Sequence, residues 1–239
     1  MNEFSAFTPR ALTFLRQLKR HNEREWFKAR KDEFESLLQQ PLRLFVEEMD
    51  VRLARLAPEL HGNPKRSIFR IHRDTRFSQD KTPYKTHVSC WFTHVRAGHG
   101  VGTETHGAGA GYYFHLEPGA SLVAGGIWMP PRPALAAIRD RIAMRGSELQ
   151  ALLRARGLVK RFSPLSEEGR LTRTPRGFPS AHPQSELLRH VSFTISTPLS
   201  DANVVSTLLP KLVEKEFIAM RPMVRWLNDA LGYPEQESR

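Results

Sequence analysis

The stretch GYYFHLEPGASLVAGGIWM, residues 111–129, decides the fold class. Residues 112–116 and 121–129 are rich in aromatic and β-branched side chains, and Glu117, Pro118 and Gly119 stand between them. Two such runs joined by a short glycine-containing turn predict a β-hairpin, whose strands are antiparallel. We therefore expect a sheet built mainly from antiparallel strands.

The N-terminal segment, residues 8–57, is predicted to be helical. Apolar residues recur there at the three- and four-residue spacing of an amphipathic helix. Asn22, with Glu25 three residues later, predicts a capping box that starts the second helix. Pro41 predicts a kink or a short break, because proline cannot donate the helical hydrogen bond.

The sheet core is predicted to cover residues 67–130. From Ile68 the apolar period changes to two, which predicts one strand over residues 68–77. A second strand is expected at 86–95, with Val88, Cys90 and Phe92 on one face. The glycine-rich residues 96–111 are expected to form a loop.

The C-terminal segment, residues 131–232, mixes helices with one late strand. Its expected elements are helices from about 134 and near 148–156, a long loop at 163–186, a strand at 191–196 and a closing helix before Gly232. Helices, then antiparallel strands, then helices indicate an α+β fold and not a doubly wound sheet. We expect one compact α+β domain over residues 1–239, with a mainly antiparallel sheet flanked by N-terminal and C-terminal helices.

The overall composition is that of a globular protein, with 40% hydrophobic and 26% charged residues. No apolar run approaches the roughly 20 residues that span a bilayer, so no membrane association is expected. The N-terminus lacks the pattern of a secretory signal. The single cysteine, Cys90, excludes an internal disulfide framework, and a cytoplasmic location is the simplest prediction.

The net charge of +11 is concentrated in two segments. Residues 65–87 and residues 154–176 each hold seven Lys or Arg against two acidic residues, a net +5 apiece. The two segments either meet in one electropositive cleft or form two separate solvated stretches.

The basic segment 65–87 contains the candidate site. If it is extended, Arg73 falls on an apolar face, where an unpaired guanidinium is costly to bury. Guanidinium groups bind phosphate or carboxylate through paired hydrogen bonds, and lysines add point charges. The candidate ligand-binding residues are Arg70, Arg73, Arg76, Lys81 and Lys85. The alternative is an internal ion-pair network, in which Asp74 and Asp80 hold the arginines together.

Four residues near the basic side chains are candidates for acid–base chemistry. Asp74 is placed to orient an arginine or to act as a base, and Tyr84 to donate a hydrogen bond. His72 and His87 flank the motif and titrate near neutral pH. Neither histidine is favoured over the other by its spacing.

Several runs carry a resemblance to a known family. They are Phe14-Leu15-x-x-Leu18, Asn22-x-Arg24-Glu25-Trp26-Phe27, the run from Phe69 to His87, Gly111-Tyr112-Tyr113-x-His115-Leu116-Glu117-Pro118, Gly125-Gly126-Ile127-Trp128-x-Pro130 and Arg176-Gly177-Phe178-Pro179. These runs resemble the bacterial and fungal family catalogued as domain of unknown function 2461. The resemblance covers nearly the whole chain and implies one compact domain. It implies no activity.

The histidines suggest a metal site, but their spacing does not support one. His87, His94, His99, His106 and His115 are the histidines concerned. Zinc sites usually contain tight local pairs of His or Cys, and here only His94 and His99 come close to that spacing. The sequence therefore predicts no metal site, and it identifies no cofactor.

Three functional hypotheses follow from the sequence. The first is a cationic cleft that binds a small anionic ligand, with a phosphorylated molecule as the first expectation, and it leaves open whether the protein is an enzyme. The second is a nucleic-acid-binding module, which the sequence pI near 10.3 favours. The third is a structural or interaction protein whose basic motif is an internal ion-pair network.

Overall fold

A computed structural model describes residues 6–76, 78–97, 108–233 and 235. The N-terminal helices are α1 (Pro9–Arg20), α2 (Arg24–Lys28), α3 (Lys31–Phe34), the π-helix η1 (Glu35–Gln39) and α4 (Gln40–Leu56). The strands are β1 (Leu60–His61), β2 (Val88–His94), β3 (Gly111–Leu116), β4 (Leu122–Ile127) and β5 (Phe193–Pro198). The remaining helices are α5 (Arg132–Arg154), α6 (Arg156–Val159), α7 (Ser185–Leu188), α8 (Asp201–Val204) and α9 (Leu209–Ala230).

The five strands form one sheet in the order β1-β2-β3-β4-β5, and each neighbouring pair is antiparallel. The predicted hairpin is confirmed as β3 and β4, and the α+β class is confirmed as well. Strand β1 was not predicted, because two residues are too few to show a period. Within the described residues, none of the helices combines the length and the apolar content that crossing a membrane requires.

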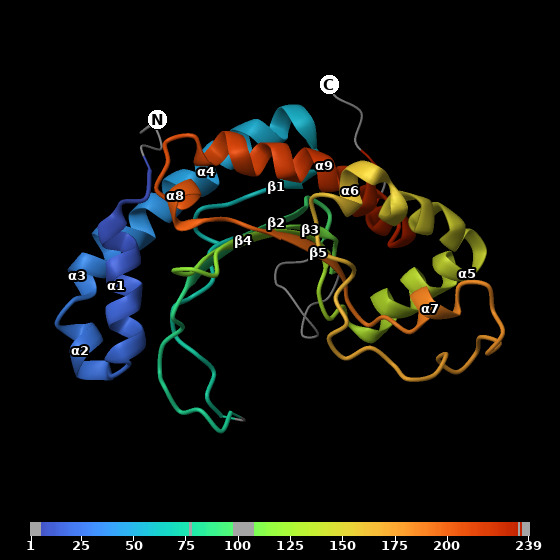
Figure 1. Cartoon of the computed structure of the whole chain (residues 1–239), viewed down its shortest axis with the longest axis horizontal. Coiled ribbons are helices and arrows are strands. Elements are labelled where there is room, and N and C mark those ends of the chain that lie inside the picture. The colour runs from blue at the N-terminus through green and yellow to red at the C-terminus, as the bar shows by residue number, and fades with distance from the viewer. Residues whose placement is uncertain (1–5, 77, 98–107, 234, 236–239) are drawn as a thin grey trace.

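One face of the sheet is covered by helices. Helices α4 and α9 lie together over it in Figure 1, and aromatic pairs hold the layers together. Phe217 of α9 stacks on Tyr112 with ring centroids 4.3 Å apart, and Phe45 of α4 lies 4.5 Å from Phe114. Along β3, the buried Tyr112 and Phe114 alternate with partly buried residues, because successive side chains of a strand point to opposite faces. Helices α4 and α9 thus bury one face of the sheet and leave the opposite face without this cover.

Two irregular segments add to the edges of the sheet. The backbone N–H of Phe69 donates to Ser89 and that of Trp91 donates to Ser67, each at 3.0 Å. At the other edge, the N–H of Ser163 donates to Ser196 of β5 at 2.8 Å. Figure 1 shows both segments extending beyond the face that α4 and α9 leave uncovered. Residues of both segments line one cavity together with residues of the sheet, so the segments form the sides of a trough whose floor is the sheet.

The predicted strand over residues 68–77 is wrong. Among its described residues, 68–76, Ile68 and His72 alone form β-bridges, with Cys90 and Tyr84. Ile68 and Phe69 pair with β2, but from Ile71 the segment pairs with residues 83–85, because the N–H of Lys85 donates to Ile71 and the N–H of Arg73 donates to Pro83. The apolar period of two correctly predicted that the backbone of this segment is extended. It did not show whether the segment forms a strand of the sheet.

The predicted helix boundaries are confirmed in part. The helix changes to the π-helical turn η1 just before Pro41, but Gln39 and Gln40 keep helical dihedral angles, so the expected break near this proline is not present. The two helices expected after residue 134 are one helix, α5, with non-helical dihedral angles at Arg145. The closing helix α9 is followed by Gly232, whose φ of 76° is suited to a helix end.

Asn22 does not form the predicted capping box. Its side-chain amide donates to the carbonyl of Tyr84 at 2.9 Å, and its side-chain oxygen accepts the N–H of Tyr84 at 3.0 Å. Helix α2 starts after Glu23 with no side-chain cap. An asparagine side chain has one carbonyl acceptor and an NH₂ donor, so it can pair with the backbone N–H and the backbone carbonyl of the same residue, here Tyr84. Asn22 therefore ties the basic segment to the N-terminal helices.

Replacing Asn22 by alanine leaves the N–H and carbonyl of Tyr84 without these partners. We expect the free energy of unfolding to fall by about 1–3 kcal/mol, measured by urea denaturation. The control is Glu25→Ala, which removes the side-chain acceptor of the predicted capping box and is expected to change stability by less than about 0.5 kcal/mol. A larger loss from Glu25→Ala than from Asn22→Ala would restore the capping interpretation.

Candidate functional site

The uncovered face of the sheet carries a cavity of about 760 Å³. This volume lies within the range of roughly 300–1,000 Å³ that small-molecule sites occupy. The cavity extends from the basic segment at the edge of β2 to residues 163–168 at the edge of β5. It is the trough described above.

The floor of this cavity is made of small side chains. Gly111, Ala124 and Gly126 from β3 and β4 line it, and hydroxyls come from Ser89 and Ser196. Small residues at these positions leave the volume open, whereas the covered face carries phenylalanine and leucine. In small-molecule sites, a few polar groups of this kind fix the orientation of the ligand.

Aromatic rings form the walls of the cavity. Phe69, Trp91, Tyr113 and Trp128 all line it. Trp128 is 44% exposed, and its indole N–H donates to the carboxylate of Glu168 at 3.0 Å. Aromatic walls favour a ligand with a flat apolar body, since rings stack on such surfaces.

Lys85 is the cation at one end of the cavity. Its ammonium lies 5.3 Å from the ring centroid of Phe69 and has no ion pair with any carboxylate of the described chain. Burial lowers the pKa of Lys85, and the nearby charge of Arg70 lowers it further. Asp74 is close enough to Arg70 for the positive charge of Arg70 to lower the pKa of Asp74, so Lys85 is the one of these two cations that has no carboxylate partner in the described chain. An ammonium without a counter-ion makes this end of the cavity suited to an anion.

The second basic segment borders the opposite end of the same cavity. However, the residues that it contributes are Ser163–Glu168, and the charged ones are Glu167 and Glu168. The two basic segments therefore lie on either side of one cavity without joining their cations in it. Arg170 instead pairs with Glu167 and Glu186 at 2.9 and 2.5 Å.

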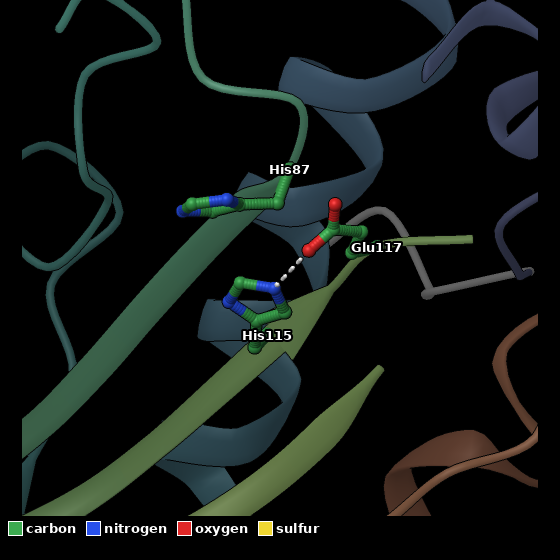
Figure 2. A group of neighbouring side chains, drawn as sticks. All are labelled: His87, His115 and Glu117. Carbon is green, nitrogen blue, oxygen red and sulfur yellow. Dashed lines mark hydrogen bonds and ion pairs between the residues drawn. The ribbon is translucent and has the colours of Figure 1, made fainter. Parts of the chain in front are cut away.

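A cluster of two histidines and one glutamate lies near Lys85 (Figure 2). His87 precedes β2, His115 is on β3 and Glu117 follows β3, and their ligand atoms all lie within 4.8 Å of one another. Nε2 of His115 lies 3.2 Å from Glu117, and Nδ1 of His115 lies 2.9 Å from the hydroxyl of Tyr113. His87 and Tyr113 line the cavity, so the cluster lies at its end.

The protonation states in this cluster follow from burial and hydrogen bonding. Burial lowers the pKa of His87 to about 4, with a further contribution from His115. Burial also lowers the pKa of His115. For Glu117 burial raises the pKa, but the hydrogen bonds from His115 and Thr86 outweigh it and lower the pKa. At neutral pH the cluster therefore holds two neutral imidazoles and one carboxylate.

The structure divides the nine sequence-predicted site residues into three groups. Lys85 and His87 line the sheet cavity. His72, Arg73, Lys81 and Tyr84 line a separate groove of about 830 Å³ against α2. Arg70, Asp74 and Arg76 line neither.

Two of the predicted ligand-binding arginines are held by carboxylates of the same segment. Arg73 pairs with Asp80 and also contacts Thr82, and Arg76 pairs with Asp74 at 2.7 Å. Hydrogen bonds from Arg76 lower the pKa of Asp74 to about 2, which does not suit a general base near neutral pH. The internal ion-pair network thus accounts for Arg73 and Arg76, but not for Lys85.

The groove against α2 is basic. Five Lys or Arg residues line it with two glutamates, and three of these cations, Arg24, Lys28 and Lys31, come from the N-terminal helices. Lys81 donates to the carbonyl of Thr75 at 2.9 Å. Tyr84 is buried and stacked on Phe27 with ring centroids 4.1 Å apart, so its ring is part of the core.

The remaining histidines of the metal hypothesis do not form a described site. His94 is fully buried, stacks on Tyr233 and accepts the backbone N–H of Arg96 through Nδ1. His99 and His106 lie outside the described residues.

The sequence reasoning did not assign His115 and Glu117 to a site. A partial signal was available, because residues i and i+2 of a strand share a face, which places His115 and Glu117 together. The pairing of β2 with β3, which adds His87, is not fixed by a short turn in the sequence. Tight local pairs of His or Cys, the pattern sought in the sequence, do not describe ligands on strands, where residues two apart share a face.

The fold and site define an α+β protein with a five-stranded antiparallel sheet, helices on one face and a ligand-sized cavity on the other. The chain belongs to the family described as "Conserved hypothetical protein (DUF2461)", whose model matches residues 10–226. No curated protein and no solved structure matches the chain.

Proposed function

We propose that this protein binds a small organic anion with a flat apolar body on the uncovered face of its sheet. The proposal rests on the environment of Lys85. Its ammonium is partly buried, has no carboxylate partner in the described chain and lies beside a cavity of ligand size. Arg70 adds a second positive charge close to it. A phosphate, carboxylate or sulfonate group supplies the missing countercharge.

The rest of the ligand contacts the walls and floor. Phe69 and Trp91 offer ring faces or edges to an apolar body, and Ser89, Thr194 and Ser196 offer hydroxyls. A cavity with mostly apolar walls and few polar groups is the usual form of a small-molecule site. The proposal keeps the anionic ligand, Lys85 and Arg70 from the sequence prediction, and it leaves out Arg73, Arg76 and Lys81.

A pair of probes tests the charge requirement. Anilinonaphthalene sulfonate and phenylnaphthylamine share their ring systems and differ by the sulfonate, and the fluorescence of both increases on binding. We expect Lys85→Met to weaken binding of the sulfonate about tenfold, the equivalent of 1.4 kcal/mol, and to leave binding of the neutral probe unchanged.

Lys81→Met is the matched control, because Lys81 belongs to the same segment but lines the groove against α2. It is expected to change neither affinity. Equal effects of Lys81→Met and Lys85→Met on the sulfonate would contradict the assignment to the sheet cavity. Thermal unfolding of each variant checks that the fold is retained, since loosely folded states also bind the sulfonate.

Nucleic-acid binding is the second candidate, supported by the basic groove against α2. Five cations and two carboxylates leave this groove with a net positive lining. Binding of a labelled oligonucleotide would weaken steeply with salt and would respond to Lys28→Ala, not to Lys85→Met. Absence of binding at low salt would remove this candidate.

A further inference from the structure

We propose that His87, His115 and Glu117 form a binding site for a divalent first-row transition metal ion such as Zn²⁺. Two imidazoles and a carboxylate are a ligand set that zinc and other first-row metals accept. The inference is independent of the organic ligand proposed above.

The strand register brings the three residues together. Val88 pairs with Leu116 and Ser89 pairs with His115, so the same antiparallel register puts residue 87 opposite residue 117. His115 and Glu117 share a face because they are two residues apart. The three side chains therefore converge from one antiparallel strand pair, and sites built on strands are more precise than sites on loops.

The distances require little change to admit a metal. With metal–ligand bonds of about 2.0–2.2 Å, the donor atoms of a tetrahedral site lie roughly 3.3 Å apart. Nε2 of His115 and the carboxylate of Glu117 are already 3.2 Å apart, and no pair of ligand atoms in the cluster exceeds 4.8 Å. Small rotations of the side chains bring the third donor, His87, to the required distance.

The surrounding hydrogen bonds orient two of the ligands. The hydroxyl of Tyr113 holds Nδ1 of His115, which leaves Nε2 facing Glu117. Thr86 donates to Oε1 of Glu117 at 3.0 Å, and the ammonium of Lys19 lies 3.9 Å from that same oxygen. Oε2 is therefore directed at His115. Such outer partners fix the tautomer and orientation of metal ligands.

The third ligand, His87, lines the cavity. His87 makes no side-chain hydrogen bond to the described part of the chain, and its ring lies 4.1 Å from that of His115. Figure 2 shows the two imidazoles one above the other, with Glu117 beside them. Three protein ligands leave at least one position for water or for a molecule in the cavity.

Metal titration of the full chain, first stripped with a chelator, tests this proposal. Calorimetry with Zn²⁺ and the visible absorption of Co²⁺ are expected to show one ion per chain at this site. His115→Ala and the isosteric Glu117→Gln are each expected to weaken binding by at least about 100-fold, more than loss of an outer partner usually costs. Bound Zn²⁺ should raise the melting temperature of the wild type but not of Glu117→Gln.

The His99→Ala/His106→Ala double variant is the control for the histidine-rich stretch and is expected to keep full affinity. Unfolding of the metal-free variants by denaturant checks that they remain folded. The proposal is overturned if the wild type binds neither ion, or if Glu117→Gln binds as tightly as the wild type.

Discussion

Replacing Gly126 by alanine is expected to lower the free energy of unfolding by about 3–5 kcal/mol and to leave little folded protein. Gly126 has a φ of 125°, which residues with a side chain rarely adopt. A Cβ at this position would lie 1.9 Å from the carbonyl oxygen of Phe193, on the neighbouring strand. That oxygen belongs to the backbone of β5, so the strand itself would have to move. Urea denaturation of the purified variant measures the loss.

Gly119→Ala is the matched control for this substitution. Gly119 also has a positive φ, 75°, but a Cβ there meets nothing within 4 Å. We expect a loss of only about 1–2 kcal/mol, the cost of the left-handed conformation alone. Equal losses at the two positions would show that the close approach of β4 and β5 is not the cause.

Replacing Ala124 by tryptophan is expected to weaken binding of both the sulfonate and the neutral probe by roughly 10- to 100-fold. Ala124 lies on the floor of the cavity, between Tyr113 on β3 and Ser196 on β5. An indole there occupies the volume that the ligand needs. The fold should persist within about 1 kcal/mol, because tryptophan is well accepted in strands. Fluorescence titration of both probes measures the effect.

The control for Ala124→Trp adds the same side chain elsewhere on the surface. Val51 on α4 is 44% exposed and does not line the cavity, so Val51→Trp is expected to leave both affinities unchanged. Undiminished binding by Ala124→Trp would place the ligand outside the sheet cavity.

The antiparallel sheet could be predicted from the sequence because its central signal is local. The turn at Glu117–Gly119 and the strands on either side of it fix the pairing of β3 with β4. The period of two also placed Val88, Cys90 and Phe92 on the buried face. By contrast, the role of Asn22 depends on Tyr84, which is 62 residues away in the chain, and no local pattern records that contact.

The site was harder to predict because it depends on which face of the sheet stays uncovered. Ala124 and Gly126 look like weak strand residues in the sequence, and their significance appears only once α9 is placed on the opposite face. Charge patterning correctly drew attention to the segment that contains Lys85. It left open whether Asp74 and Asp80 hold the arginines or leave them free for a ligand, since the pairing of Arg73 with Asp80 and of Arg76 with Asp74 depends on how the segment turns.

A crystal structure of the protein with anilinonaphthalene sulfonate tests the central claim most directly. We expect the rings to lie on the sheet between Phe69 and Trp91, with the sulfonate within hydrogen-bonding distance of Nζ of Lys85. A sulfonate bound instead among Arg24, Lys28 and Lys31, with the sheet cavity unoccupied, would contradict the account.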